Sequence, residues 1–286
     1  MALSYVGIQK TQQELGIALR PYQHPKGDND DKSVTLSELA KKAMEFNLDA
    51  IHRPNGNIDM LKQFIAAGIP VITRTRLRKE DDIGHYRIIK GYDDTTKEFI
   101  QDDSYQGKNL RLSYTDFSDL WQTFGNEYLM IIPHEKLTIV TSILGSQWEE
   151  SVAWQGAVQS AVSSLAKHPD DIYTRLNLSV ALYHTKDFKG SVSEFEKVES
   201  NLPFRTLWYQ IEPILSYYEL GNYTRVFEIT DNIFTNQNRA FSELYILRGR
   251  IYQKQGNKQK AKEEFEKAVL YNSALQEARE ALTSVQ

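Results

Sequence analysis

Hydrophobic and polar positions follow two different patterns along the chain, and the change falls near residue 134. In the first half, Thr11 and Thr35 each stand three residues before a glutamate, the capping-box pattern that begins a helix. Helices are therefore predicted over 15–19 and 39–46. Asn57 is a further N-cap, and it predicts a helix over 58–67 that ends at Gly68.

The rest of this half is rich in β-branched and aromatic residues. Strands are predicted over 69–73, 86–92, 97–101 and 127–132, with a short helix over 113–124. Pro70 confines its strand to a strand start or an edge, and Asp93-Asp94-Thr95-Thr96 is a turn signal. Helices followed by an antiparallel sheet indicate an α+β domain over 1–134.

The second half has helical periodicity throughout and repeats itself. Lys186, Gly221 and Gly256 are spaced 35 residues apart (221 − 186 = 35; 256 − 221 = 35), each shortly after a tyrosine. The sequence Glu-Phe-Glu-Lys recurs at 194–197 and 264–267. A period of this length is typical of an array of helical hairpins.

The repeated segments resemble tetratricopeptide (TPR) repeats over residues 149–286, after a linker at 135–148. The third repeat has the family's spacing best, at Tyr245, Gly249, Tyr252, Gly256, Ala261, Phe265 and Ala268. Lys186 replaces the turn glycine of repeat one, and Pro213 should kink the first helix of repeat two. Residues 150–169 are expected to add a partial unit, and 274–285 a capping helix.

Composition excludes several classes of function. The formal net charge is −4 and the pI near 5.9, so no basic field favours nucleic acid. No apolar run approaches the roughly 20 residues that span a bilayer. The chain has no cysteine, which excludes disulfides and thiolate metal sites but does not fix the compartment.

His85 and Asp103 are the candidate catalytic residues. If the predicted strands 86–92 and 97–103 pair around a turn near Thr95, partner numbers sum to about 190 and Asp103 faces Arg87. His85 then lies two residues away on the same face, about 7 Å along the strand. An imidazole and a carboxylate could therefore meet, as a general base and its orienting acid do. The alternative is an Arg87–Asp103 ion pair that stabilises the hairpin.

Residues 1–134 resemble the papain-like cysteine peptidases of the C39-like, bacteriocin-processing type found in bacteria. The resemblance lies in Thr11-Gln-Gln-Glu-Leu15, 61–72, Gly84-His85-Tyr86 with Gly91-Tyr92-Asp93, and 99–107. It implies that His85 is the general base and Asp103 its orienting residue. Ser104 stands where the family usually has proline, so Asp102 competes for that role. The nucleophilic cysteine and the oxyanion glutamine would fall before Met1.

Other chemistry is poorly represented. Asp81, Asp82 and His85 lack a second cluster of metal ligands, and the acidic residues 93, 94, 102 and 103 are explained by turn solvation. No metal or cofactor is therefore expected. The remaining histidines, at positions 24, 52, 134, 168 and 184, have no partner pattern. Tyr173, Tyr183, Trp208 and Tyr218 are predicted on first helices of the repeats, where they line a peptide groove or pack internally.

Two functions remain open from the sequence. The first is a cysteine peptidase that is incomplete in this chain because a thiolate is lacking, with the repeats recruiting a polypeptide substrate. The second is a non-catalytic scaffold that holds a peptide at the peptidase-like domain and a protein partner at the TPR groove. An in-frame Asn-Cys-Gly-Pro segment upstream of Met1 would favour the first, and would leave room for export or membrane anchoring.

Overall fold

The computed structural model describes residues 1–23, 33–236 and 238–285. The chain divides into two compact units. The first contains residues 1–9 and 35–206, and the second contains 10–34 and 207–286. The chain therefore leaves the first unit after Gln9 and re-enters it at Thr35, and it leaves again after Thr206.

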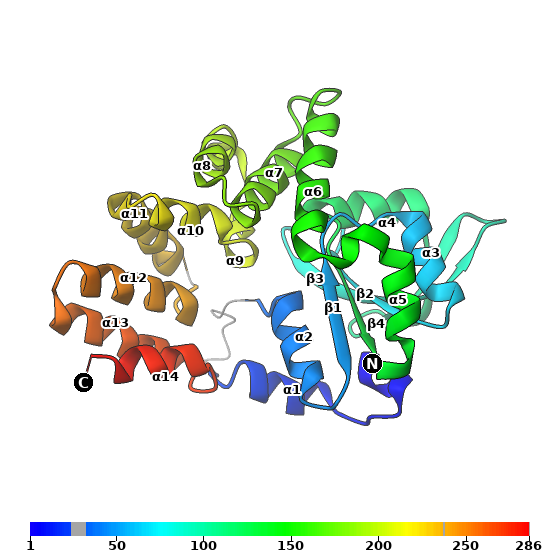
Figure 1. Cartoon of the computed structure of the whole chain (residues 1–286), viewed down its shortest axis with the longest axis horizontal. Coiled ribbons are helices and arrows are strands. Elements are labelled where there is room, and N and C mark those ends of the chain that lie inside the picture. Colours follow the sequence, from blue (N-terminus) through cyan, green and yellow to red (C-terminus); the bar gives the residue numbers. More distant parts are fainter. Residues whose placement is uncertain (24–32, 237, 286) are drawn as a thin grey trace. The chain divides into compact units, whose positions relative to one another are not determined.

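The first unit is built on an antiparallel sheet (Figure 1). In the described residues the sheet has six strands, in the order β1-β6-β2-β3-β4-β5. The strands are β1 (Asp49–Arg53), β2 (Val71–Arg76), β3 (Gly84–Asp93), β4 (Glu98–Asp103), β5 (Gly107–Ser113) and β6 (Tyr128–Ile132). Pro70 immediately precedes central strand β2, so the strand-start alternative holds. Strands β1 and β5, at the two edges, were not among the predicted strands.

Helices cover both faces of this sheet. Their bounds are α2 (Leu36–Met44), α3 (Ile58–Ala66), α4 (Tyr114–Trp121) and α5 (Leu137–Leu144). One face packs residues of α3, α4 and α5 against Val71, Ile89 and Phe99, and the other packs α2 against Ile72 and Ile88. Leu61, Phe64, Phe117 and Trp121 are fully buried, which makes the first face the main core.

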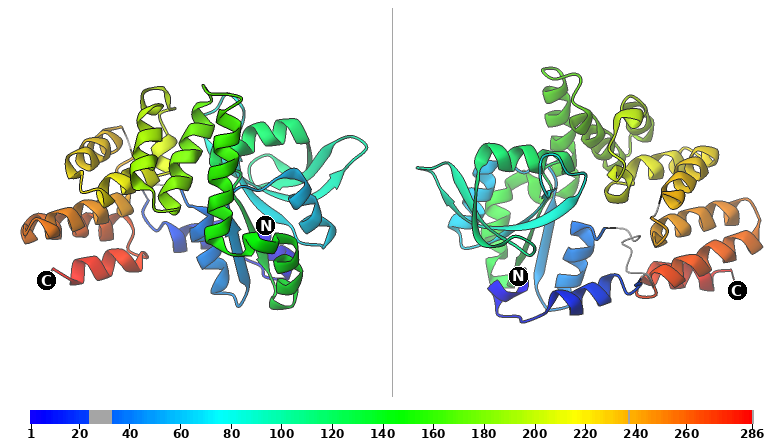
Figure 2. Two further views of the ribbon diagram at one scale, coloured as in Figure 1. Left: turned by 45° about the horizontal axis from the view of Figure 1, so that its top comes forward. Right: turned by 180° about the vertical axis from the view of Figure 1, so that it is seen from behind.

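The N-caps of this unit follow the sequence pattern. Thr35 and Glu38 form a reciprocal capping box at the start of α2, and the Asn57 side chain accepts from the Met60 N–H at the start of α3. Gly68 takes a φ of +68° after α3, a conformation open to glycine at little cost. In Figure 2 the end of one cyan hairpin of the sheet projects beyond the helices, while Ile89 of β3 and Phe99 of β4 pack in the main core.

Three further helices belong to the first unit. They are α6 (Glu150–Leu165), α7 (Ile172–His184) and α8 (Phe188–Glu196). Asn177 on α7 donates to the Gln122 carbonyl (2.6 Å), which joins this helix to the end of the sheet domain. Residues 135–148, expected as a linker, are helical for most of their length, and Val140 and Leu144 of α5 are buried in the main core.

The second unit consists of helices in the part of it that the structure describes. Their bounds are α1 (Gln12–Leu19), α10 (Glu212–Glu219), α11 (Tyr223–Thr235), α12 (Ser242–Lys254), α13 (Lys258–Tyr271) and α14 (Gln276–Thr283). The short α9 (Thr206–Tyr209) ends before Pro213, which lies at the start of α10. The predicted kink is therefore an interruption of the helix, because proline lacks an N–H and clashes with the preceding turn.

The 35-residue period reappears in the backbone. Lys186, Gly221 and Gly256 have φ values of +66°, +73° and +77°, and each is followed by an Asp or Asn that caps the next helix. Gly249 lies against Phe265 so closely that a Cβ would meet the ring at 2.3 Å. The helices of this hairpin can therefore approach closely only because residue 249 has no side chain.

Candidate functional site

His85 and Asp103 meet at the end of the β3–β4 hairpin. The register pairs Arg87 with Asp103, Ile88 with Asp102 and Ile89 with Gln101, so partner numbers sum to 190 as predicted. His85 Nε2 donates to Asp103 Oδ2 over 2.8 Å. The two side chains that the sequence singled out are therefore a hydrogen-bonded pair.

Alternation along the strands explains why this pair forms. His85, Arg87 and Ile89 share one face of β3, and Asp103 shares that face on β4 because it lies opposite Arg87. Ile89 belongs to the main core, so the polar pair continues the same face beyond the point where the core ends. The Asp103 side chain is fully buried, and that of His85 is 16% exposed.

Asp103 is held by four groups. Oδ1 accepts from the N–H groups of Tyr105 (2.7 Å) and Gln106 (2.8 Å), while Oδ2 lies 2.8 Å from His85 and 3.6 Å from Arg87 Nε. Burial raises the pKa of Asp103, but the hydrogen bonds from Gln106, His85 and Tyr105 outweigh it, so its pKa lies below the usual value. The carboxylate is therefore ionised and fixes the orientation of the imidazole.

Arg87 is a buried partner of this site. Its side chain is 2% exposed, and its guanidinium donates to the Thr75 hydroxyl and to the carbonyls of Arg76 (2.8 Å) and Leu77 (2.7 Å). The hairpin ion pair considered as an alternative thus coexists with the His85 contact on the same carboxylate oxygen. The pair is buried, so it is not one of the exposed ion pairs that contribute about 0–1 kcal/mol.

Asp102 has a different set of partners. It accepts from Tyr5 Oη (2.7 Å), from Lys90 Nζ (2.6 Å) and from the Asn109 N–H (2.9 Å). Its neighbour in the register is Ile88, which packs on the opposite face of the sheet from His85. Asp103, and not Asp102, is therefore the carboxylate that contacts the imidazole.

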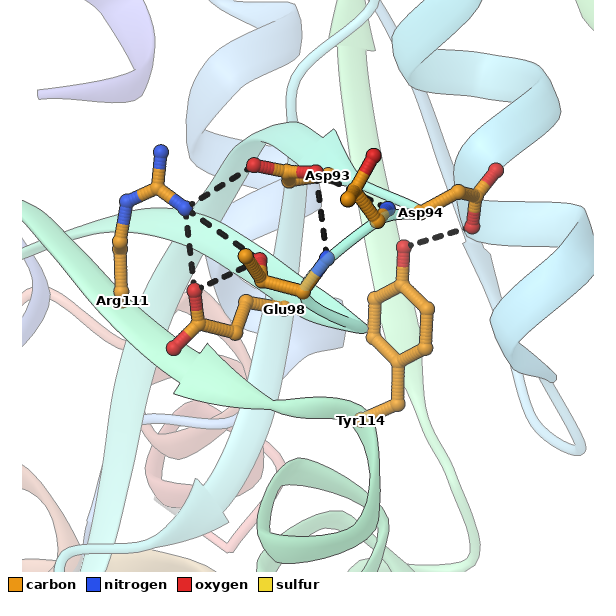
Figure 3. A network of polar contacts seen from close by, with 7 residues as sticks. Asp93, Asp94, Glu98, Arg111 and Tyr114 are labelled. Atoms are coloured by element: carbon orange, nitrogen blue, oxygen red, sulfur yellow. Dashed lines mark hydrogen bonds and ion pairs between the residues drawn. The ribbon is translucent and has the colours of Figure 1, made fainter.

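The acidic residues at the hairpin tip are bound by nearby cations and amides (Figure 3). Arg111 contacts Asp93 (3.2 Å) and Glu98 (3.0 Å), and Tyr114 Oη donates to Asp94 (3.1 Å). Burial and the Asp94 contact raise the pKa of Tyr114 to about 12. Within 1–23, 33–236 and 238–285, no group of three His, Cys, Asp or Glu side chains could hold a metal ion.

Three other histidines have partners that no sequence pattern indicated. His134 Nδ1 lies 2.9 Å from Asp49, His52 Nε2 lies 3.3 Å from Glu127, and His184 stacks on Trp154 at 3.7 Å between ring centroids. The His134 side chain is 84% exposed. His24 lies outside the described residues.

The segment between the end of β2 and His85 contacts residues much further along the same unit. Asp82 Oδ2 accepts from the Arg205 N–H over 2.6 Å, and the Arg76 guanidinium lies 5.2 Å from the centre of the Tyr173 ring. These contacts join residues about a hundred positions apart, and nothing in the local sequence indicates them. Tyr173 is thereby in contact with the last residue of β2.

The other aromatic residues of the predicted peptide groove lie in two places. Tyr183, also in the first unit, contacts Phe188 at 5.7 Å between ring centroids. In the second unit, Trp208 is 8% exposed, and Lys254 Nζ lies 4.2 Å from the centre of the Tyr218 ring. A peptide groove along these four residues stays a prediction.

Two family matches support a peptidase-like domain and a protein-interaction domain of helical repeats in this chain. Residues 1–129 match the Peptidase_C39 like family, and residues 242–275 match the tetratricopeptide repeat. Both regions are those in which the sequence resemblances lay.

Among solved structures, a thermophilic TPR protein of Thermus thermophilus is similar to the chain, with 17% identity and a TM-score of 0.38. The alignment covers 50% of this chain and 77% of that one. No curated protein matches the chain. Across the described parts of the chain, none of the helices has the length and apolar character needed to cross a bilayer.

Proposed function

We propose that this chain holds a polypeptide beside His85 and Asp103 without cleaving it, while its TPR region recruits a protein partner. The observation that carries the proposal is a hydrogen-bonded imidazole–carboxylate pair in a chain of 286 residues that contains no cysteine. A general base without a nucleophile to activate forms no acyl intermediate.

The same pair is suited to binding. Because the Asp103 carboxylate accepts from Nε2, neutral His85 carries its lone pair on Nδ1, and that atom has no hydrogen-bond partner among the described residues. A peptide N–H can donate to it. Ile83, 41% exposed, and Tyr105, 75% exposed, flank the pair in sequence and offer apolar contacts to the peptide's side chains.

A second candidate is a cysteine peptidase whose thiol comes from residues outside the given sequence. Support for it comes from the His85–Asp103 pair, because an oriented imidazole is the base that a cysteine nucleophile requires. In this reading the present chain supplies the base, the orienting acid and the partner-binding repeats.

Peptide binding and peptide cleavage can be measured separately. The resemblance to bacteriocin-processing peptidases of the double-glycine-leader type suggests a peptide that ends in Gly-Gly. Binding of such a peptide, labelled with fluorescein, is measured by anisotropy, and cleavage is measured with a fluorogenic peptide of the same sequence. We expect saturable binding without turnover. Loss of one hydrogen bond in His85→Ala should weaken binding about 2–10-fold.

His134→Ala is the matched control, because it removes an imidazole from an exposed aspartate pair of the same unit. It should leave binding unchanged. Equal binding by His85→Ala and the wild-type chain would contradict the proposal. Turnover by the 286-residue chain that disappears in His85→Ala would show that it cleaves. Turnover that requires the product of the complete gene and is blocked by iodoacetamide would favour the second candidate.

A further inference from the structure

The second unit holds an extended segment of the chain's own N-terminal region. Residues 10–34 belong to this unit, although the chain on either side of them belongs to the first. Helix α1 ends at Leu19, and Arg20 then takes a φ of −137° and a ψ of 80°. Residues 20–22 therefore follow the end of α1 as a short non-helical segment, inserted from elsewhere in the sequence, that contacts α12 and the end of α13.

Three kinds of group contact this segment. The Arg20 guanidinium lies 3.1 Å from Glu243 Oε1 on α12. Asn272 Nδ2, just after α13, donates to the Leu19 carbonyl over 3.1 Å. The Tyr22 ring meets the Tyr271 ring edge to face, at 5.1 Å between centroids and 81° between planes.

The contacts are buried and their geometry is fixed. Arg20 is 7% exposed and Asn272 is 3% exposed, and arginine is rarely so buried unless it is paired. Asn272 Oδ1 also accepts from the Ala274 N–H, which aims its Nδ2 at the segment. Tyr271 stacks on Tyr245, and Tyr245 stacks on Phe234, so Tyr22 meets the end of a row of packed rings.

Each contact reads a different property of the segment. Asn272 binds a main-chain carbonyl, so this contact does not depend on the sequence of the bound segment. Glu243 requires a cation, and the planar guanidinium of arginine fits a carboxylate best. Tyr271 requires an aromatic ring two residues later. Pro21 between them fixes φ, so that the segment loses less conformational entropy on binding. Together they describe a receptor for an extended Arg-Pro-aromatic segment.

We infer that the site formed by Glu243, Tyr271 and Asn272 recognises an extended Arg-Pro-aromatic segment of a protein partner, and that Leu19–Tyr22 occupies it as an internal ligand. A partner segment binds by displacing the internal one. This inference specifies the ligand class of the TPR region, and so it rests on the proposed recruitment of a partner there. It is independent of what His85 and Asp103 do, so either can fail alone.

The experiment uses the full chain and a fluorescein-labelled peptide of residues 15–23, Leu-Gly-Ile-Ala-Leu-Arg-Pro-Tyr-Gln. The double variant Arg20→Ala/Tyr22→Ala weakens the internal ligand and opens the site. We expect anisotropy to show saturable binding to this variant, at least about tenfold tighter than to the wild-type chain. In the wild-type chain the internal ligand leaves the site free in only a small fraction of molecules. The apparent Kd for the peptide is the intrinsic Kd divided by that fraction, so the apparent affinity is lower.

Two further changes test the site itself. Adding Glu243→Gln or Asn272→Asp to the open variant should each weaken binding about 3–10-fold. The first removes the charge and keeps the shape, and the second removes the donor to the carbonyl but keeps the acceptor for Ala274. A control peptide has alanine in place of the residue equivalent to Arg20. Because it lacks the cation that Glu243 binds, its affinity should be the same for the open variant and for the open variant with Glu243→Gln added.

Equal affinity for the wild-type chain and the open variant would overturn the inference, as would unchanged affinity in both site variants. Circular dichroism establishes that the open variant keeps its helices. A second measurement needs no variant: excess unlabelled peptide should speed amide hydrogen exchange over residues 10–23 of the wild-type chain. Unchanged exchange there at saturating peptide would equally refute displacement.

Discussion

The substitution Asp103→Asn tests the central contact of the candidate site. Asparagine keeps the shape of the side chain and an oxygen for the Tyr105 and Gln106 N–H groups. It removes the charge that faces His85 at 2.8 Å and buried Arg87 at 3.6 Å. Its NH2 group then takes the place of Oδ2, so the variant removes both the charge and the acceptor of the His85 hydrogen bond.

The expected cost follows from burial. Removing one partner of a buried ion pair typically costs about 3–5 kcal/mol, because the other charge is left uncompensated. Arg87 keeps its bonds to Thr75 and to the carbonyls of Arg76 and Leu77, which reduces that cost. We expect Asp103→Asn to lower the free energy of unfolding by about 2–4 kcal/mol at pH 7.

The destabilisation caused by Asp103→Asn should decrease as the pH is lowered. Because the pKa of Asp103 in the folded chain lies below its usual value, the stabilisation is present above the unfolded-state pKa of about 3.9. It is lost as the pH falls through the folded-state pKa. The difference between wild type and variant should therefore be full at pH 7 and shrink progressively below about pH 4.

Urea denaturation followed by circular dichroism measures this difference, with the slopes compared to verify that the transition is unchanged. Asp49→Asn is the control, since its partner His134 is exposed and such pairs contribute about 0–1 kcal/mol. A cost for Asp103→Asn no larger than that of the control would refute the buried ion pair. So would a difference that grows toward acid pH.

Three further predictions concern the backbone, each measured by urea or thermal denaturation. Lys186→Gly should stabilise the chain by about 0.5–1 kcal/mol. A left-handed conformation costs a residue with a side chain about 1–2 kcal/mol, and the larger conformational entropy of glycine in the unfolded chain cancels part of the gain. A loss of stability would contradict this. Gly256→Ala, at a φ of +77°, should destabilise by about 1 kcal/mol although no atom lies near the added Cβ; a neutral result would show that the conformation is not strained. Gly249→Ala should cost about 1–3 kcal/mol through its clash with Phe265, whereas the helical control Gly16→Ala, with open space around it, should gain about 0.5–1 kcal/mol; the same sign for both would exclude the packing explanation.

The sequence predicted the His85–Asp103 contact because both residues belong to one hairpin. A turn at 93–96 and two apolar strands determine the register, and the register determines which side chains share a face. The edge strand β5 was missed because its apolar residues are Leu110 and Leu112 alone, and so short an alternation is a weak strand signal beside the exposed Lys108, Asn109 and Arg111. Its pairing with β4 decides its conformation.

Contacts between segments far apart in the chain could not be predicted from local sequence patterns either. The hydrogen bond from Arg205 to Asp82 and the ion pair between Arg20 and Glu243 join residues far apart, in segments whose local patterns predict nothing about each other. The left-handed conformation of Lys186 was accessible only through its place in the 35-residue period, since lysine itself does not favour it.

The sequence pattern changes near residue 134, but the first compact unit ends at Thr206. The two boundaries differ because the pattern reflects secondary structure and the unit reflects tertiary packing. The pattern changes where strands give way to helices, and the C39-like match ends nearby, at residue 129. Compactness continues to Thr206, because Val140 and Leu144 complete the main core and Asn177 binds the end of the sheet domain. The first helical hairpin is thus a structural part of the unit that carries His85, and the loop before His85 is bonded through Asp82 to Arg205, which follows that hairpin in the chain. A fragment cut at residue 134 would remove those supports, so a loss of peptide binding by that fragment would not by itself test the role of His85.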